Sequence, residues 1–248
     1  MDPTRFQRAA EILLGAQRIA VLTGAGISAE SGVPTFRGED GLWRRFRAED
    51  LATPEAFARD PRTVWEWYDW RRGIISKAKP NPGHMVLAQW EKKLPEFKLI
   101  TQNVDGLHAR AGSTEIVELH GNIWKTRCTR EETVAENLEV PLKRIPPACP
   151  NCGAMLRPHI VWFGESLDRD ILSRAFGAST LCDVMLVVGT SAFIQPAASL
   201  PLRASESGAK IIEINPGPTP LTHYADLSLQ GKAGEILPRI DQLLALPS

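Results

Sequence analysis

A glycine-rich turn near the N-terminus has the residue types and spacing to bind a phosphate group. Gly24, Gly26 and Ala29 follow the apolar run 19–22 and fit the G-x-G-x-x-G/A spacing of the first strand-to-helix turn in dinucleotide-binding folds. The first glycine permits a tight turn, the second lets the backbone approach a pyrophosphate, and the small third residue lets the helix pack close to the strand. An ordinary strand-to-helix turn has the same spacing, so the motif alone leaves both interpretations open.

Three polar residues follow later strand-like runs and could carry acid–base chemistry. Asn103 and Asp105 come after the run 97–101, and His120 comes after the run 116–119. Strand ends of an open α/β sheet face the ligand crevice, where a histidine with a pKa of about 6.5 can act as a general base at neutral pH. The alternatives are structural: His120 could cap its strand, and Asn103 and Asp105 could form an Asx turn.

Two further strand ends carry small polar residues. Gly189, Thr190 and Ser191 end the most apolar run, and Asn215 ends the next one. Backbone N–H groups and hydroxyls at 189–191 could bind phosphate, and the Asn215 amide could bond a ribose. Either group could instead cap the turn that follows its strand.

Three cysteines have the spacing of a structural metal site that lacks one ligand. Cys149 and Cys152 form a C-x-x-C motif, and Cys128 lies 149 − 128 = 21 positions earlier. A four-cysteine zinc site needs a second C-x-x-C there, but the residue at that position is Glu131. The sequence leaves open a three-thiolate zinc site completed by another ligand and a vestigial site without metal. Cys182, beside an apolar run, is expected in the core.

A tyrosine and an arginine share one face of an expected helix. Tyr68 and Arg71 are three residues apart in the aromatic-rich stretch 65–72. A tyrosine hydroxyl beside a guanidinium is a good receptor for a carboxylate. An aromatic-rich amphipathic helix that only packs against the core is the alternative.

Taken together, these motifs resemble those of the sirtuins, which are NAD-dependent protein deacylases. The resemblance joins the stretch 24–38 to 102–105, 120–122, 189–191 and Asn215, in the family's order and spacing, and covers nearly the whole chain. It implies a doubly wound, Rossmann-like α/β fold with a parallel sheet and a small helical, zinc-ribbon-like insert. It also implies that NAD is consumed as a co-substrate.

The resemblance implies roles for individual residues. His120 would be the catalytic base, Asn103 would lie near the nicotinamide ribose and the catalytic water, and Asp105 would meet the nicotinamide carboxamide. The NAD-binding positions that the resemblance implies are Gly24, Ala25, Gly26, Ser28, Ala29, Thr35, Phe36, Arg37, Trp43, Gln102, Asn103, Asp105, Gly189, Thr190, Ser191, Asn215 and Ala233. The substrate backbone would pair with a strand formed by Val161, Trp162, Phe163 and Gly164. Zinc would be bound by Cys128, Cys149 and Cys152.

The pair Tyr68 and Arg71, with Ala52, resembles the class III sirtuins that remove succinyl and malonyl groups, which include bacterial members. The activity implied is NAD-dependent removal of succinyl, malonyl and acetyl groups from protein lysines, giving nicotinamide and 2′-O-acyl-ADP-ribose. Two alternatives remain. An ADP-ribosyltransferase or NAD glycohydrolase would use the same cleft, and a non-catalytic NAD-sensing module would bind NAD without turnover.

The elements that must position these residues follow from the apolar patterning. Continuous apolar runs separated by helical stretches indicate a parallel sheet covered on both faces. Strands are expected at 19–22, 97–101, 116–119, 184–188, 210–214 and 227–229, and helices at 3–14, 61–76, 83–94 and 233–246. We expect one sirtuin-type domain over 1–248, with an NAD-binding part at about 1–41, 95–123 and 159–248. The small part, at about 42–94 and 124–158, is expected to be strand-poor over 124–158.

Composition restricts the partners. The chain has 248 residues, 43% of them hydrophobic, and its 29 lysines and arginines balance 29 aspartates and glutamates. Neither nucleic acid nor a membrane is therefore expected as the main partner. The resemblance to the sirtuins implies acylated lysines of proteins as partners. No apolar run reaches the length of a membrane span. Four cysteines do not make a disulfide framework, so the reducing cytosol is expected. A monomer is favoured, although the sequence does not determine the oligomeric state.

Overall fold

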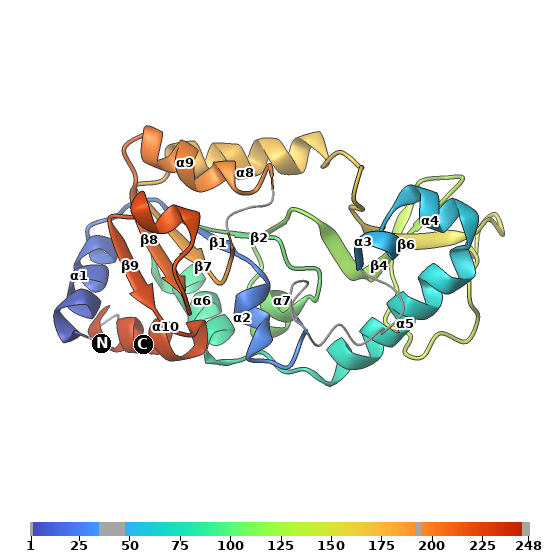
Figure 1. The fold of residues 1–248 in the computed structure, drawn as a ribbon, viewed down its shortest axis with the longest axis horizontal. Helices are drawn as coiled ribbons and strands as arrows, with labels where there is room; N and C mark the ends of the chain where they lie inside the picture. The colour runs from blue at the N-terminus through green and yellow to red at the C-terminus, as the bar shows by residue number, and fades with distance from the viewer. Residues whose placement is uncertain (1, 35–47, 192–194, 245–248) are drawn as a thin grey trace.

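A six-stranded parallel sheet forms the centre of the larger part of the molecule (Figure 1). The computed structural model describes residues 2–34, 48–191 and 195–244. In spatial order the strands are β3 (Ile116–Glu118), β2 (Phe97–Thr101), β1 (Ile19–Thr23), β7 (Val184–Val188), β8 (Lys210–Asn215) and β9 (Leu227–Gln230). The order reverses at β1, which is the switch point where doubly wound sheets bind ligands. The predicted fold class is confirmed.

The register brings the predicted functional segments to one edge of the sheet. Thr23, at the end of β1, pairs with Thr101 of β2 and with Val188 of β7. The segments that follow these three strands therefore leave the sheet side by side. Every residue of β1 and β7 is buried, as their unbroken apolar sequences predict for central strands covered on both faces.

Helices cover both faces of this sheet (Figure 1). One face is covered by α1 (Pro3–Leu14), α6 (Pro82–Lys93) and α10 (Ala233–Leu244), and the other by α8 (Arg169–Leu181) and α9 (Ser199–Glu206). The indole N–H of Trp90 on α6 donates to Asp241 of α10 at 2.7 Å, which ties two of these helices together. Among the described residues, no helix is long and apolar enough to cross a membrane.

Side-chain caps start the helices where the sequence predicts. Asp2, Asp60 and Asn81 each accept backbone N–H groups of the first turn, and a proline follows each of them. The second of these caps begins α5 (Pro61–Lys77), which is the longest described helix and carries the Tyr68 and Arg71 pair. The expected helices at 3–14, 61–76 and 83–94 are therefore confirmed to within a residue or so at their ends.

A second, smaller unit combines α5 with a three-stranded antiparallel sheet. It also contains α3 (Ala48–Leu51) and α4 (Pro54–Arg59), and its strands lie in the order β5 (Val134–Glu136), β4 (Gly121–Cys128) and β6 (Leu156–Ile160). The expectation of a strand-poor stretch at 124–158 is wrong. An antiparallel sheet can leave one face to solvent, so its strands need no continuous apolar run, and β4 alternates buried and half-buried residues over 125–128.

The small unit has its own hydrophobic cluster. Trp65 and Tyr68 of α5 pack there with Ile123, Cys128 and Trp162. The Trp65 indole N–H donates to the Leu156 carbonyl at 2.8 Å, which fastens α5 to β6. The remaining short helices, α2 (Ala25–Ala29), α7 (Leu107–Ala111) and the 3₁₀ helix η1 (Pro220–His223), follow strands of the large sheet.

Candidate active site

The glycine turn after β1 packs directly against the turn after β7. The Gly24 amide donates to the Val188 carbonyl at 3.0 Å, and the Gly26 amide donates to the Gly189 carbonyl at 2.8 Å. A Cβ atom on Gly24 would lie 2.7 Å from Cβ of Thr190, and one on Gly26 would lie 2.7 Å from the Gly189 oxygen. The two predicted phosphate-binding segments thus form one continuous surface, and both glycines are required for this packing.

Side chains at the ends of β1, β2 and β7 are joined by hydrogen bonds. The Gln102 amide donates to the Thr190 hydroxyl at 2.9 Å. The Asn103 amide donates to the Gly24 carbonyl at 3.0 Å and to the Ser28 hydroxyl at 3.2 Å. The glycine turn, the 102–105 segment and the 189–191 segment therefore converge, as their positions in the sequence predict.

His120 is held with one ring nitrogen facing the protein. Its Nδ1 lies 3.0 Å from the backbone carbonyl of Gln102, which can only accept a hydrogen bond. The proton of the neutral ring therefore sits on Nδ1, and Nε2 is left as an acceptor. Burial lowers the pKa of His120, and the bond to Gln102 opposes this shift. At neutral pH the ring is uncharged and has the form that a general base requires.

Asp105 occupies a buried turn beside these groups. Its carboxylate accepts the Leu107 amide at 2.8 Å, and only 4% of the residue is exposed. Burial raises the pKa of Asp105, while hydrogen bonds from Leu107 and Ser28 and the charge of Arg71 act in the opposite direction. Because a carboxylate has about four acceptor sites, this one can also accept an amide N–H of a ligand.

Four polar residues beneath Asn103 were not singled out from the sequence. Thr23 Oγ1 lies 2.8 Å from Thr101 Oγ1 and 2.9 Å from Nε2 of His108, and Thr101 accepts the Asn103 amide. The ring centroids of His84 and His108 lie 4.8 Å apart with the ring planes tilted by 54°, and burial lowers their pKa values to about 4 and about 3. The signal available in the sequence was that both threonines end neighbouring parallel strands.

The residues predicted for the adenosine half lie at the end of β8 and just after β9. Asn215 donates its side-chain amide to the Gly217 carbonyl at 2.9 Å, the turn-capping contact that was the alternative interpretation. Its own carbonyl accepts the Gly231 amide at 3.0 Å. Ala233 is buried against Gly83, where an added Cβ would lie 3.1 Å from the Ala233 backbone. Four predicted NAD-binding residues lie outside the described residues: Thr35, Phe36, Arg37 and Trp43.

Tyr68 and Arg71 lie together, as the helical spacing predicts. The Tyr68 hydroxyl oxygen accepts the Trp162 indole N–H at 2.9 Å, and burial raises the pKa of Tyr68 to about 12. The Arg71 guanidinium carbon lies 4.9 Å from the ring of Trp67 and 5.9 Å from that of Tyr68. The tyrosine is therefore neutral and keeps an O–H proton that can donate to a partner.

The segment 161–164 is not a strand in this structure. β6 ends at Ile160, and the amides beyond it donate to loop carbonyls: Val161 to His120 at 3.0 Å and Phe163 to Ala52 at 2.9 Å. No strand forms here because these amides bond loops on either side and not a neighbouring strand, and the pairing with a substrate backbone stays a prediction. Trp162 is buried, whereas Phe163 is 44% exposed.

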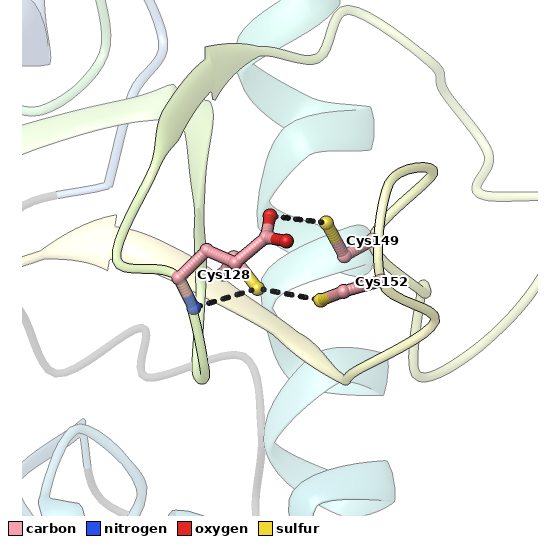
Figure 2. Close-up of side chains that lie close together, drawn as sticks. Cys128, Cys149 and Cys152 are labelled. Carbon is pink, nitrogen blue, oxygen red and sulfur yellow. Dashed lines mark hydrogen bonds between the residues drawn. The ribbon is translucent and has the colours of Figure 1, made fainter.

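The three cysteines of the small unit meet a carboxylate. Their side chains gather in one cluster (Figure 2). The sulfurs of Cys128 and Cys152 lie 3.5 Å apart. Cys149 lies 3.7 Å from a carboxylate oxygen of Glu131, and the four ligand atoms lie within 4.8 Å of one another. Zinc bonds of about 2.3 Å at tetrahedral angles separate sulfurs by about 3.8 Å, so the donor set fits a zinc ion. Glu131 is thus placed where the fourth ligand that the sequence left open would be needed.

Backbone groups prepare the cysteine cluster for a cation. The amides of Glu131 and Arg130 both point at the Cys128 sulfur from 3.4 Å, and these hydrogen bonds lower the pKa of its thiol. A thiolate is the form that binds a metal. Cys182 is buried in the core of the large sheet, as expected.

Comparison with known proteins gives concordant matches. A model described as the Sir2 family matches residues 24–196. The NAD-dependent protein deacylase of Aquifex aeolicus is 57% identical over 222 residues, which cover 90% of this chain and 93% of that protein. NAD-dependent protein deacylase 1 of Caldanaerobacter subterraneus is 55% identical over 222 residues, 90% of this chain and 92% of that protein.

Solved structures agree over nearly the full length. A Sir2 homologue in complex with NAD superposes with a TM-score of 0.90 at 48% identity, covering 96% of this chain and 93% of that one. A variant Sir2 homologue in complex with 2′-O-acetyl ADP-ribose superposes with a TM-score of 0.91 at 47% identity, covering 99% of both chains. A Sir2 variant with a deacetylated p53 peptide and 3′-O-acetyl ADP-ribose superposes with a TM-score of 0.85 at 34% identity, covering 98% of this chain and 99% of that one.

Proposed function

The chain belongs to the Sir2 family and is an NAD-dependent protein deacylase, and we propose that it removes succinyl and malonyl groups from protein lysines in preference to acetyl groups. The products would be nicotinamide, the free lysine and 2′-O-acyl-ADP-ribose. The observation that carries the proposal is the meeting of Tyr68 and Arg71 beside Trp162.

A carboxylate at the end of an acyl chain needs partners in such a place. An unpaired charge in apolar surroundings is costly, whereas a guanidinium can donate two N–H groups to one carboxylate. Because the indole N–H of Trp162 can only donate, it occupies the Tyr68 oxygen as an acceptor and leaves the hydroxyl proton for a ligand. Arg71 and Tyr68 can therefore bond the same carboxylate from one helix face.

The polar strand ends support an NAD site at the switch point of the large sheet. We propose that Gly24, Gly26 and Gly189 let the backbone approach the phosphates, and that Asn215 bonds the adenosine ribose. Asp105 would accept the carboxamide of nicotinamide. Asn103, fixed by bonds to Gly24 and Ser28, would orient the nicotinamide ribose and water.

His120 supplies the base that the reaction requires. The acyl oxygen attacks C1′ of the nicotinamide ribose as nicotinamide leaves, and a ribose hydroxyl must then lose its proton. The unprotonated Nε2 of His120 can take that proton, because the bond from Nδ1 to Gln102 fixes the tautomer and the ring orientation. Burial keeps the ring neutral before the transfer.

Cys128, Cys149, Cys152 and Glu131 would hold a structural zinc ion. Zinc would crosslink β4 to the 149–152 turn, and no residue proposed for catalysis belongs to this cluster. All four cysteines are free thiols, which a zinc site requires and a reducing compartment maintains, and we propose the cytosol.

A single peptide carrying different acyl groups on one lysine tests the acyl preference. We expect kcat/KM to be higher for the succinyl and malonyl peptides than for the acetyl peptide. A higher value for the acetyl peptide would refute the preference while leaving the deacylase activity intact. Mass analysis of the products distinguishes the alternatives, since an ADP-ribosyltransferase would leave ADP-ribose on protein and a glycohydrolase would release it free.

A further inference from the structure

Trp124 of β4 contacts the turn that carries Asp105. Its indole N–H donates to the backbone carbonyl of Asp105 at 2.8 Å. The edge of the same ring faces Gly106, whose φ is +74° and where an added Cβ would lie 3.0 Å from Cδ1 of the indole. The ring therefore fits against this turn with no space for a side chain at the glycine.

The indole is itself held by a buried arginine. Arg72 of α5 is fully buried, and its guanidinium carbon lies 5.3 Å from the Trp124 ring. Arg72 donates to the backbone carbonyl and side-chain oxygen of Asn137, and the Asn137 amide donates to the Trp124 carbonyl at 2.7 Å. On the other side, the Trp124 amide donates to Asn122 at 2.8 Å. The backbone of Trp124 is thus fixed by two bonds and its ring by a cation.

Packing alone is a poor explanation for this arrangement. Nε and Nη1 of Arg72 are buried without a hydrogen-bond partner among the residues that the structure describes. Burying a cation with unbonded donors is destabilising, and an apolar residue of the same size would fill the space at lower cost. The arrangement does achieve one thing, which is a fixed orientation of the indole N–H toward Asp105.

We propose that Trp124 is a positioning residue for NAD: its indole N–H, oriented by Arg72, fixes the Asp105 turn in the geometry that receives nicotinamide. The inference rests on the proposed role of Asp105. The carboxylate of Asp105 is held from one side by the Leu107 amide, and its backbone carbonyl is held from the other by Trp124. Removing the second bond lets the peptide rotate, and the carboxylate moves with it.

The test is Trp124→Phe, which keeps an aromatic face for Arg72 and removes the N–H donor. We expect KM for NAD and the inhibition constant of nicotinamide to rise about 3- to 10-fold, as the loss of one buried hydrogen bond predicts. KM for the acylated peptide should change less than about twofold. If the phenylalanine variant does not fold, 3-benzothienylalanine at position 124 keeps the bicyclic shape and replaces the N–H by sulfur.

Trp65→Phe is a matched control. Trp65 also donates its indole N–H to a backbone carbonyl at 2.8 Å, but that carbonyl belongs to Leu156 in the core of the small unit. This variant should lower the melting temperature and leave KM for NAD unchanged. Equal increases of KM for NAD in the two variants would mean that Trp124 acts only through stability, and no increase in Trp124→Phe would also overturn the inference.

Asp105→Asn separates the inference from the proposed function beneath it. A raised KM for NAD in Asp105→Asn with none in Trp124→Phe would overturn only the role of Trp124. An unchanged KM for NAD in Asp105→Asn would contradict the nicotinamide role of Asp105, and the inference would fall with it.

Discussion

The proposed NAD side and the proposed acyl side of the site are built by different means. On the NAD side, backbone groups at the ends of β1, β2 and β7 are brought together by strand register, and glycines let them touch. On the acyl side, the side chains of Tyr68 and Arg71 from a helix meet that of Trp162 from a loop. The hydrogen bond between Tyr68 and Trp162 joins residues 94 positions apart in the sequence. Substitutions should therefore affect catalysis on the first side and discrimination between acyl groups on the second.

The largest effect is expected from His120→Ala on the NAD side. Loss of a general base costs about 10²- to 10⁴-fold in rate, and this loss should be the same for succinyl and acetyl peptides. NAD should still bind, as measured by titration calorimetry. His223→Ala, at an exposed histidine in η1, is the control and should leave turnover unchanged. Retention of more than about a tenth of wild-type turnover by His120→Ala would remove the base from the mechanism.

The pH dependence of kcat/KM is a second test of His120 as the general base. Burial lowers the pKa of His120, so the neutral base persists to a lower pH than an exposed histidine would allow. In wild-type enzyme, kcat/KM should therefore fall with acid only below the ordinary histidine value of about 6.5. That acid limb should be absent from the residual activity of His120→Ala.

Arg71→Met should produce the next largest effect, and only on one substrate. Hydrogen bonds to a charged group contribute about 1.5–3 kcal/mol, so kcat/KM for a succinyl peptide should fall by about 10- to 100-fold. The acetyl peptide lacks the carboxylate and should react at an unchanged or improved rate. Arg62→Met, an exposed arginine on the same helix, should change neither. An equal fall for both peptides would mean that Arg71 supports the fold.

Glu131→Ala tests whether the carboxylate completes the metal site. Changes outside the ligand shell already lower metal affinity about 10- to 100-fold, and the loss of a ligand should lower it at least as much. Zinc should then be lost on dialysis against a chelator that leaves it in wild-type protein, and the melting temperature should fall. Glu131→Cys should retain zinc, and Glu136→Ala on β5 is the exposed control. Folded, active wild-type protein that contains no metal would show that the site is vestigial.

The sequence could predict features that depend on local chemistry or strand register better than contacts between distant side chains. Short-range patterns predicted the caps of α1 and α5, the central strands, and the convergence of Asn103 with the glycine turn, because local chemistry and parallel register determine them. The antiparallel sheet was missed, since half-exposed strands such as β4 carry no continuous apolar run.

Contacts between distant side chains could not be predicted from spacing at all. Glu131 stands where a four-cysteine site would have a cysteine. Only the folded turn shows that its carboxylate lies beside Cys149. The same holds for three other contacts: His108 with Thr23 at 85 positions apart, Trp162 with Tyr68 at 94 and Trp124 with Asp105 at 19. Each needs the tertiary structure because its partner lies on a different element.

The smallest effect is expected from the bond between Trp162 and Tyr68. The guanidinium carbon of Arg157 lies 3.6 Å from the ring of Trp162. The backbone amide of Trp162 donates to the Glu165 carboxylate at 2.8 Å. Trp162→Phe keeps the ring and removes the N–H that orients the Tyr68 hydroxyl. Loss of one neutral hydrogen bond predicts a fall of about 2- to 10-fold in the ratio of succinyl to acetyl kcat/KM.

A double-mutant cycle separates that bond from the position of Trp162 within the segment 161–164, which the resemblance to sirtuins implies for substrate binding. In a Tyr68→Phe background the hydroxyl is gone, so Trp162→Phe should have no further effect on the ratio of the two kcat/KM values. A loss of activity common to both peptides would report packing and should appear in either background. If the ratio falls equally with and without the Tyr68 hydroxyl, the indole affects acyl choice through the segment 161–164. Discrimination on the acyl side would then depend partly on backbone placement, as on the NAD side.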